Sequence, residues 1–202
     1  SLLLAKDDLA GAVKMAEDGL SKYPQSLPVQ TLSLNTITTL LDKNRVEDAE
    51  RLISKYPGTS PGLVFQQGAL AFRKGDYPLA QSLFREAARR ASEKTAESAL
   101  FNENLAALNA NDAAGAAALV KEAAGSAQLR EHILFEQAHY AAKRMNPQAP
   151  ELLASFVALA TDPALRTQAR LDQAEVALNL NPPDLETVQA ILPPLEKEQL
   201  TP

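Results

Sequence analysis

Cysteine and tryptophan are absent from this chain of 202 residues. Without cysteine it can form no disulfide, no thiolate zinc site and no thiol nucleophile, although this absence does not indicate a cellular compartment. It contains only two histidines and eight scattered glycines, and neither a glycine-rich phosphate loop nor a His-Glu-x-x-His motif occurs. The sequence therefore predicts a protein that is not an enzyme and holds no metal or cofactor.

Positive charge is also scarce. Lys and Arg total 20 against 25 Asp and Glu, which gives a formal net charge of -5. With no positive excess to attract a phosphate backbone, the sequence predicts no nucleic-acid partner. No apolar run approaches the roughly 20 residues that span a bilayer, so no membrane insertion is expected.

Helix-forming residues dominate what is present, because apolar residues make up 46% of the chain and aromatic residues only 5%. One short pattern recurs at 64–68, 100–104, 134–138 and 170–174, at shifts of 36, 34 and 36 residues. Each copy is followed three positions later by an alanine: Ala71, Ala107, Ala141 and Ala177. A helical pattern with this period is typical of a solenoid.

Helical spacing of apolar residues and the turn residues between them predict the helix boundaries. One unpaired helix is expected over 8–22, and helix pairs over 28–41 with 46–55, 62–73 with a helix after Asp76, 97–109 with 113–124, 128–143 with 149–160, and 164–179 with 184–192. Gly75 is expected to stop its helix in a left-handed conformation. The pair Pro193 and Pro194 is expected to lie beyond the last helix, because proline disrupts helix interiors.

Residues 62–91 carry the most specific signal. Small, turn and packing residues stand at the spacings of a known repeat: Gly68, Ala71, Gly75, Asp76, Tyr77, Ala80, Phe84 and Ala87. This segment resembles the tetratricopeptide repeat, although Val64 and Leu100 replace the family's signature aromatic residue and the last two units are degenerate. The resemblance implies an all-α fold, a right-handed α-α superhelix of about five helix-turn-helix repeats plus a half repeat. A single domain over 1–202 is then expected, with units 1–24, 28–57, 62–91, 96–125, 128–162 and 163–194.

The opening leucines resemble the last turn of a helix that begins upstream. An intact solenoid begins with a capping unit that has a polar outer face, whereas this chain begins with Leu2, Leu3 and Leu4. The chain is therefore expected to be a segment of a longer protein, with possible self-association through this N-terminal edge.

The resemblance also implies a binding surface, because the first helices of successive units form the concave wall in this family. The residues carried over to that wall are Leu34, Phe65, Phe72, Arg73, Phe101, Leu105, Asn109, His132, Phe135, His139, Lys143, Leu171, Glu175 and Asn179. Five of them are equivalent and form an apolar series: Leu34, Phe65, Phe101, Phe135 and Leu171. Two interpretations stay open for the series, burial between helices and an exposed groove with apolar anchors for a peptide.

The two histidines offer one alternative chemistry. His132, Glu136 and His139 share a helix face, which is enough for a weak metal site. No fourth ligand is near in sequence, so contact with a partner or with solvent is the favoured interpretation.

These patterns lead to two functional hypotheses. The first is a protein-protein interaction module that binds a peptide or protein in its concave groove. The alternative is a structural or assembly segment of a larger repeat protein, whose ends pack on adjacent repeats or on a second copy.

Overall fold

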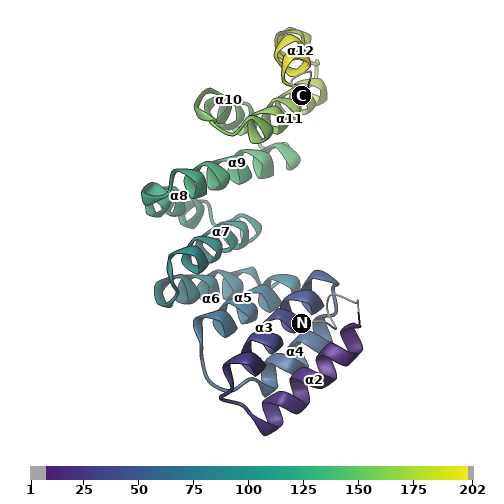
Figure 1. Cartoon of the computed structure of the whole chain (residues 1–202). Helices are drawn as coiled ribbons and strands as arrows, with labels where there is room; N and C mark the ends of the chain where they lie inside the picture. The colour runs from purple at the N-terminus through teal and green to yellow at the C-terminus, as the bar shows by residue number, and fades with distance from the viewer. Residues whose placement is uncertain (1–7, 200–202) are drawn as a thin grey trace. The chain divides into compact units, whose positions relative to one another are not determined.

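A computed structural model describes residues 8–199 of the chain, apart from the side chains of residues 192 and 194–199. The regular structure of this part is entirely helical (Figure 1). In chain order its elements are α2 (Leu9–Lys22), α3 (Leu27–Asp42), α4 (Val46–Lys55), α5 (Pro61–Arg73), α6 (Tyr77–Arg90), α7 (Glu93–Asn109), α8 (Ala113–Glu122), the 3-10 turn η1 (Ala123–Gly125), α9 (Ala127–Lys143), α10 (Ala149–Leu159), α11 (Pro163–Asn179) and α12 (Leu185–Gln199). The predicted all-α fold is confirmed, whereas Leu2, Leu3 and Leu4 lie outside the described residues.

The chain divides into two compact units, Ser1–Asp112 and Ala113–Pro202. The first unit contains α2 to α7, and the second contains α8 to α12. Each unit has its own packing and is described by itself. The single domain over 1–202 stays a prediction.

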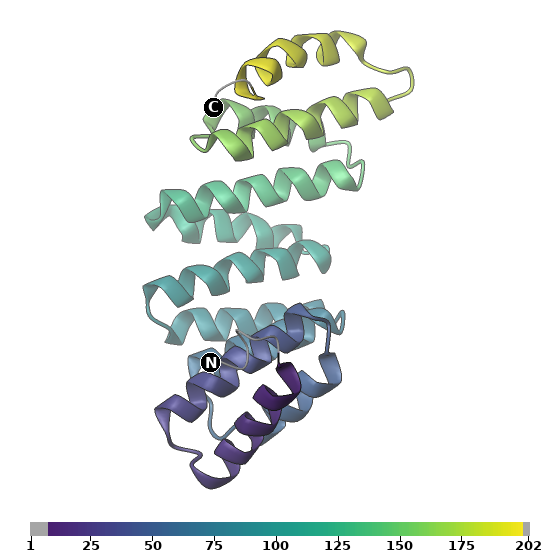
Figure 2. The same ribbon diagram turned by 45° about the vertical axis from the view of Figure 1, so that its right-hand side comes forward.

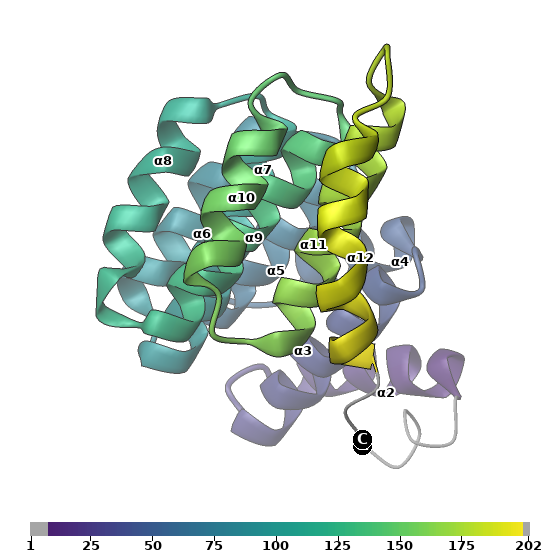
Figure 3. The same ribbon diagram turned by 90° about the horizontal axis from the view of Figure 1, so that it is seen from above.

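Neighbouring helices pack on one another in chain order within each unit. In the first unit, α3 contacts α4, α5 contacts α6 and α6 contacts α7, while α5 also contacts α3 and α7. In the second unit, α10 packs on both α9 and α11, and α9 also contacts α11 directly (Figure 2). The last helix, α12, lies along α11 (Figure 3). This sequential packing of paired helices is that of an all-α solenoid.

Four helix ends share one turn geometry. The residues with positive φ at these ends are Asn44, Gly75, Asn111 and Met145. At each end two crossed backbone hydrogen bonds close the turn, as in Asp76 N to Ala71 O and Gly75 N to Phe72 O, both 3.0 Å. This is the Schellman motif, in which a left-handed residue lets the chain satisfy the last helical carbonyls. It confirms the left-handed conformation that the sequence predicts for Gly75.

Met145 is the residue least suited to this geometry. The left-handed conformation is unfavourable by about 1–2 kcal/mol for a residue that has a Cβ atom. The Met145 side chain is exposed, so little packing is lost when it is removed. We expect Met145→Gly to raise the free energy of unfolding by about 1 kcal/mol, after allowance for the flexibility of glycine in the unfolded chain. Urea unfolding measures the change. As the matched control, Gly75→Ala should lower stability by a similar amount, and a loss of stability in Met145→Gly would contradict the argument.

The predicted end of the last helix is wrong. The last helix was expected to stop at residue 192, but α12 continues through Pro193 and Pro194 to Gln199. A proline inside a helix lacks the N–H donor and its ring crowds the carbonyl group four residues earlier, which disfavours the helix without forbidding it. The preceding turn also departs from the shared geometry, because the N–H groups of Leu180 and Asp184 both donate to Ala177 O.

Each unit is held by apolar clusters between its helices. Ile37, Leu40 and Leu52 are fully buried in the first unit. Phe84 belongs to a separate cluster of this unit. Gly68 lies against its ring, so that a Cβ atom at residue 68 would stand 2.9 Å from the ring. The small residue of the repeat pattern is thus required by close packing of α5 on α6.

Candidate functional site

Two aromatic residues of the first unit pack against the second helix of their own pair. The ring of Phe65 lies 5.3 Å from that of Phe84 in an edge-on arrangement. The ring of Phe72 lies 5.3 Å from that of Tyr77. Both Phe65 and Phe72 are only partly buried. Each therefore contributes to the core and also leaves some apolar surface on the first-helix face.

The other predicted site residues of this unit are divided between packing and solvent. Leu34, Phe101 and Leu105 are partly buried, whereas Arg73 is exposed. Asn109 Nδ2 donates to Leu105 O at 2.8 Å. The amide of Asn109 is therefore already engaged with its own helix, and Arg73 is the accessible cation of the predicted set in this unit.

Phe135 belongs to the core of the second unit. It is only 7% exposed, its ring lies 5.5 Å from that of Phe156 on α10, and the ring of His139 stacks on it at 5.5 Å. Of the two interpretations left open by the sequence, burial between helices therefore holds at this position. The sequence pattern left this choice open because it cannot show whether a face of one helix meets another helix.

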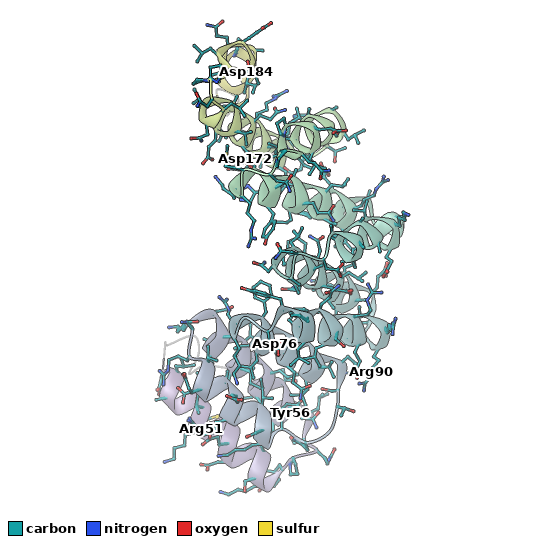
Figure 4. The ribbon with its side chains drawn as sticks, turned by 180° about the vertical axis from the view of Figure 1, so that it is seen from behind. Arg51, Tyr56, Asp76, Arg90, Asp172 and Asp184 are labelled. Carbon is teal, nitrogen blue, oxygen red and sulfur yellow. The ribbon has the colours of Figure 1, made fainter. Side chains whose placement is uncertain are left out.

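Polar side chains of α9 and α11 form a cluster in the second unit, called here the α9–α11 polar cluster. Asp172 is its centre and is 1% exposed (Figure 4). His139 Nδ1 lies 2.6 Å from Asp172 Oδ2, and Gln168 Nε2 donates to Asp172 Oδ1 at 3.3 Å. Lys143 Nζ lies 3.8 Å from Asp172 Oδ1 and 2.6 Å from Glu175 Oε2. A buried carboxylate needs such donors to compensate for the water it has lost.

The cluster also orients the His139 ring. An ionised carboxylate only accepts hydrogen bonds, so the contact with Asp172 places a hydrogen on Nδ1 of His139. The other ring nitrogen, Nε2, takes no part in this contact. The hydrogen bond to Glu175 raises the pKa of Lys143 above its ordinary value, so Lys143 stays charged at neutral pH. The α9–α11 polar cluster therefore presents one oriented imidazole, that of His139, and one ammonium group, that of Lys143.

An equivalent contact occurs in the first unit. Gln66 Nε2 on α5 donates to Thr38 Oγ1 on α3 at 2.8 Å. Gln66 and Asp172 occupy the same position of the recurring pattern, and each is buried. A polar residue at this position thus joins one first helix to the preceding one. The sequence analysis missed both residues, although the pattern carries a polar side chain there in all four copies.

Glu136 occupies this same position in the copy at 134–138. It lies close enough to His139 and Asp172 of the α9–α11 polar cluster to interact with their charges. Burial raises the pKa of its carboxyl above the ordinary value, and nearby Asp172 adds to this, while His139 and His132 oppose it. The folded state therefore binds a proton at Glu136 more tightly than the unfolded state. The stability that this tighter proton binding contributes is fully present below the pKa that Glu136 has in the unfolded state. It is lost as the pH rises through the raised pKa of the folded state.

This linkage makes a pH-dependent prediction for Glu136→Gln. The glutamine keeps the shape but cannot ionise, so the stability gained by the variant over the unmodified chain should grow from about pH 4 to pH 7. Urea unfolding of both proteins at several pH values measures this difference. Parallel pH profiles for the two proteins would contradict it.

The histidines do not gather further ligands. His132 Nδ1 lies 2.9 Å from Gln128 O on its own helix, and His139 is held by Asp172. Within residues 8–199, no group of three or more His, Asp or Glu side chains is placed to hold a metal ion. In the same part of the chain, no helix has the length and apolar character needed to cross a membrane.

Two exposed leucines stand on α11 next to the polar cluster. Leu171 is 41% exposed and Leu178 is 51% exposed. They are seven residues apart, and a helix rises about 1.5 Å per residue, so they lie on one face about 10 Å apart. Glu175 stands between them, and Asn179 Nδ2 donates to its carbonyl oxygen at 2.8 Å. Exposed apolar side chains flanked by oriented polar groups are the composition of a contact surface.

The first unit contains a second buried charge. Glu103 on α7 is 0% exposed, and its Oε1 accepts from Arg85 Nε of α6 at 2.6 Å. The Nη2 atom of Arg85 lies 2.5 Å from the same oxygen. This pair joins two helices inside the unit, so its role is in packing.

Comparisons of the chain with protein-family models, with curated proteins and with solved structures find no match. The functional argument therefore depends on the residues and contacts given above.

Proposed function

We propose that this chain is a non-catalytic protein-protein interaction module of the tetratricopeptide repeat type, which binds a peptide or protein on the face formed by its first helices. The sequential helix pairs, the recurring turn and the Gly68–Phe84 contact support this repeat type. A right-handed superhelix of about five repeats plus a half repeat is part of the same proposal. The family frame then assigns α3, α5 and α7 to the binding face of the first unit, and α9 and α11 to that of the second unit.

The observation that carries the proposal is the pair of exposed leucines on α11. The exposed side chains of Leu171 and Leu178 lie on one face of α11, near the ion pair of Lys143 and Glu175. A few residues carry most of the binding free energy at a protein interface, and an interface combines an apolar centre with a polar rim. In the first unit, Phe72 and Arg73 provide a comparable pairing of an apolar and a cationic side chain.

Affinity capture from the native source, with matched variants, tests the proposal. The double variant Leu171→Glu with Leu178→Glu should lose partners that the unmodified chain holds. Helix α10 supplies a matched control, because Leu152 and Leu159 are also seven residues apart and are 38% and 70% exposed. The double variant Leu152→Glu with Leu159→Glu should retain the partners. Equal capture by both double variants would reject the first-helix face as the binding surface, provided that circular dichroism shows equal helix content.

One observation favours the alternative role as a structural segment of a larger assembly. Helix α2 and its C-cap residue carry two exposed large side chains, Met15 and Tyr23. A surface of this kind is suited to packing on another helix. It lies on a different helix from the proposed binding face, so both roles are compatible in one chain.

A further inference from the structure

A hollow of about 260 Å³ lies between α9 and α10 in the second unit. Arg130, Glu131 and Leu134 line it from α9, and Phe156 and Leu159 line it from α10. Residues three or four positions apart share a helix face, so each helix presents one face to this space. Phe156 is only 3% exposed and forms an apolar wall that is fixed in the core of the unit. Pockets for drug-sized ligands measure about 300–1,000 Å³, so this hollow is suited to a smaller molecule with an apolar part.

Glu131 brings a fixed negative charge to the hollow. Its Oε2 accepts a hydrogen bond from Thr161 Oγ1 at 2.6 Å, and its Oε1 accepts from Asp162 N at 2.8 Å and also from Thr161 N. Burial opposes ionisation of this carboxyl, but these hydrogen bonds outweigh it and lower the pKa of Glu131 below its ordinary value. A carboxylate has about four lone-pair sites, and the three donors leave one of them on Oε2 for a further donor.

Arg130 brings a positive charge to the same hollow. Its side chain is exposed, and within residues 8–199 it forms no ion pair with Glu131 or with any other group. The two opposite charges therefore line one space without neutralising each other. A guanidinium group binds a carboxylate through two parallel hydrogen bonds, and a carboxylate oxygen accepts from an ammonium group. A small molecule that carries both groups beside an apolar chain matches Arg130, Glu131 and the wall formed by Phe156 together.

We propose that the hollow between α9 and α10 binds a free α-amino acid with an apolar side chain of about the size of leucine. Its carboxylate pairs with Arg130, its ammonium group donates to Glu131 Oε2, and its side chain lies against Phe156. A free amino acid carries both charges on one residue, whereas the residue at either end of a peptide carries one of them. Leu171 and Leu178 do not line this hollow, so the site can fail without the proposed function, and the reverse also holds.

An NMR titration of the chain with L-leucine tests the site. Saturable shifts are expected in the backbone amides of 127–134 and 156–161, with a dissociation constant of about 1 mM, since a ligand of this size buries little surface. Two analogues each lack one charge: 4-methylpentanoate has no ammonium group, and 3-methylbutylamine has no carboxylate. Each should bind about tenfold more weakly than L-leucine. Equal binding of either analogue, or no saturable shift of these amides up to about 50 mM L-leucine, would overturn the proposal.

Arg130→Gln tests the orientation of the ligand. It should weaken binding of L-leucine about tenfold and leave binding of 3-methylbutylamine nearly unchanged, because only L-leucine has a carboxylate for Arg130. Lys121→Gln is the matched control, since it removes another exposed positive charge of the same unit, and it should leave both affinities unchanged. Circular dichroism checks that both variants keep their helix content. An equal loss of L-leucine binding in the two variants would show a general effect of charge and would reject the site.

Discussion

Phe135→Glu is expected to unfold the second unit. Truncation of a buried aromatic side chain lowers stability by about 3–5 kcal/mol, and a buried carboxylate without a cation adds a further penalty. The whole unit spans Ala113–Pro202, and a domain of that size has a total stability of about 5–13 kcal/mol. The expected loss is therefore a large part of what holds α9, α10 and α11 together.

Hydrogen exchange measured by mass spectrometry separates the two units. Peptides from α9 and α11 should lose protection in Phe135→Glu, while peptides from α5 and α6 keep theirs. Leu171→Glu is the matched control, because the Leu171 side chain is 41% exposed and that of Phe135 is 7% exposed. It should keep protection in both units. Full protection of α9 in Phe135→Glu would show that this ring is not part of the core.

Arg85→Ala is expected to destabilise the first unit by about 3 kcal/mol. Removing one partner of a buried ion pair leaves the other charge without compensation, which typically lowers stability by about 3–5 kcal/mol. The lower end applies here because the Arg85 side chain is partly exposed, while Glu103 is fully buried. Thermal or urea unfolding of the variant measures the loss.

A double variant separates the charge from the packing. Arg85→Met combined with Glu103→Leu should recover stability to within about 1 kcal/mol of the unmodified chain, because apolar pairs often replace buried ion pairs without loss. The exposed pair Lys74 and Glu50 offers a contrast, and Lys74→Gln should lower stability by less than about 1 kcal/mol. A loss in the double variant as large as in Arg85→Ala would show that shape, and not charge, makes this contact important.

Most helix boundaries could be read from the sequence because they depend on local chemistry. Gly75 and Asp76 mark a turn through backbone freedom and helix capping, and the structure places φ +79 at Gly75 and the Asp76 side chain as a cap on Leu79 N at 3.2 Å. The boundary at residue 192 was wrong because a proline pair disfavours a helix without forbidding it. Met145 was missed as a left-handed residue, since its side chain carries no signal for that conformation.

The polar contacts between helices could not be predicted in this way. His139 and Asp172 are far apart in the chain, and their 2.6 Å contact depends on how α11 packs on α9. The same holds for Arg85 and Glu103. Helical periodicity shows which residues share a face, but not which face meets another helix.

The sequence by itself determined the class of fold, the pairing of the helices and the position of their turns, because spacing, capping residues and proline placement act over a few residues. Only the tertiary structure decided that Phe135 is core, that Leu171 and Leu178 are exposed, and that Asp172 joins two helices as a buried charge. Burial is a property of what surrounds a side chain, and those surroundings come from helices distant in the chain.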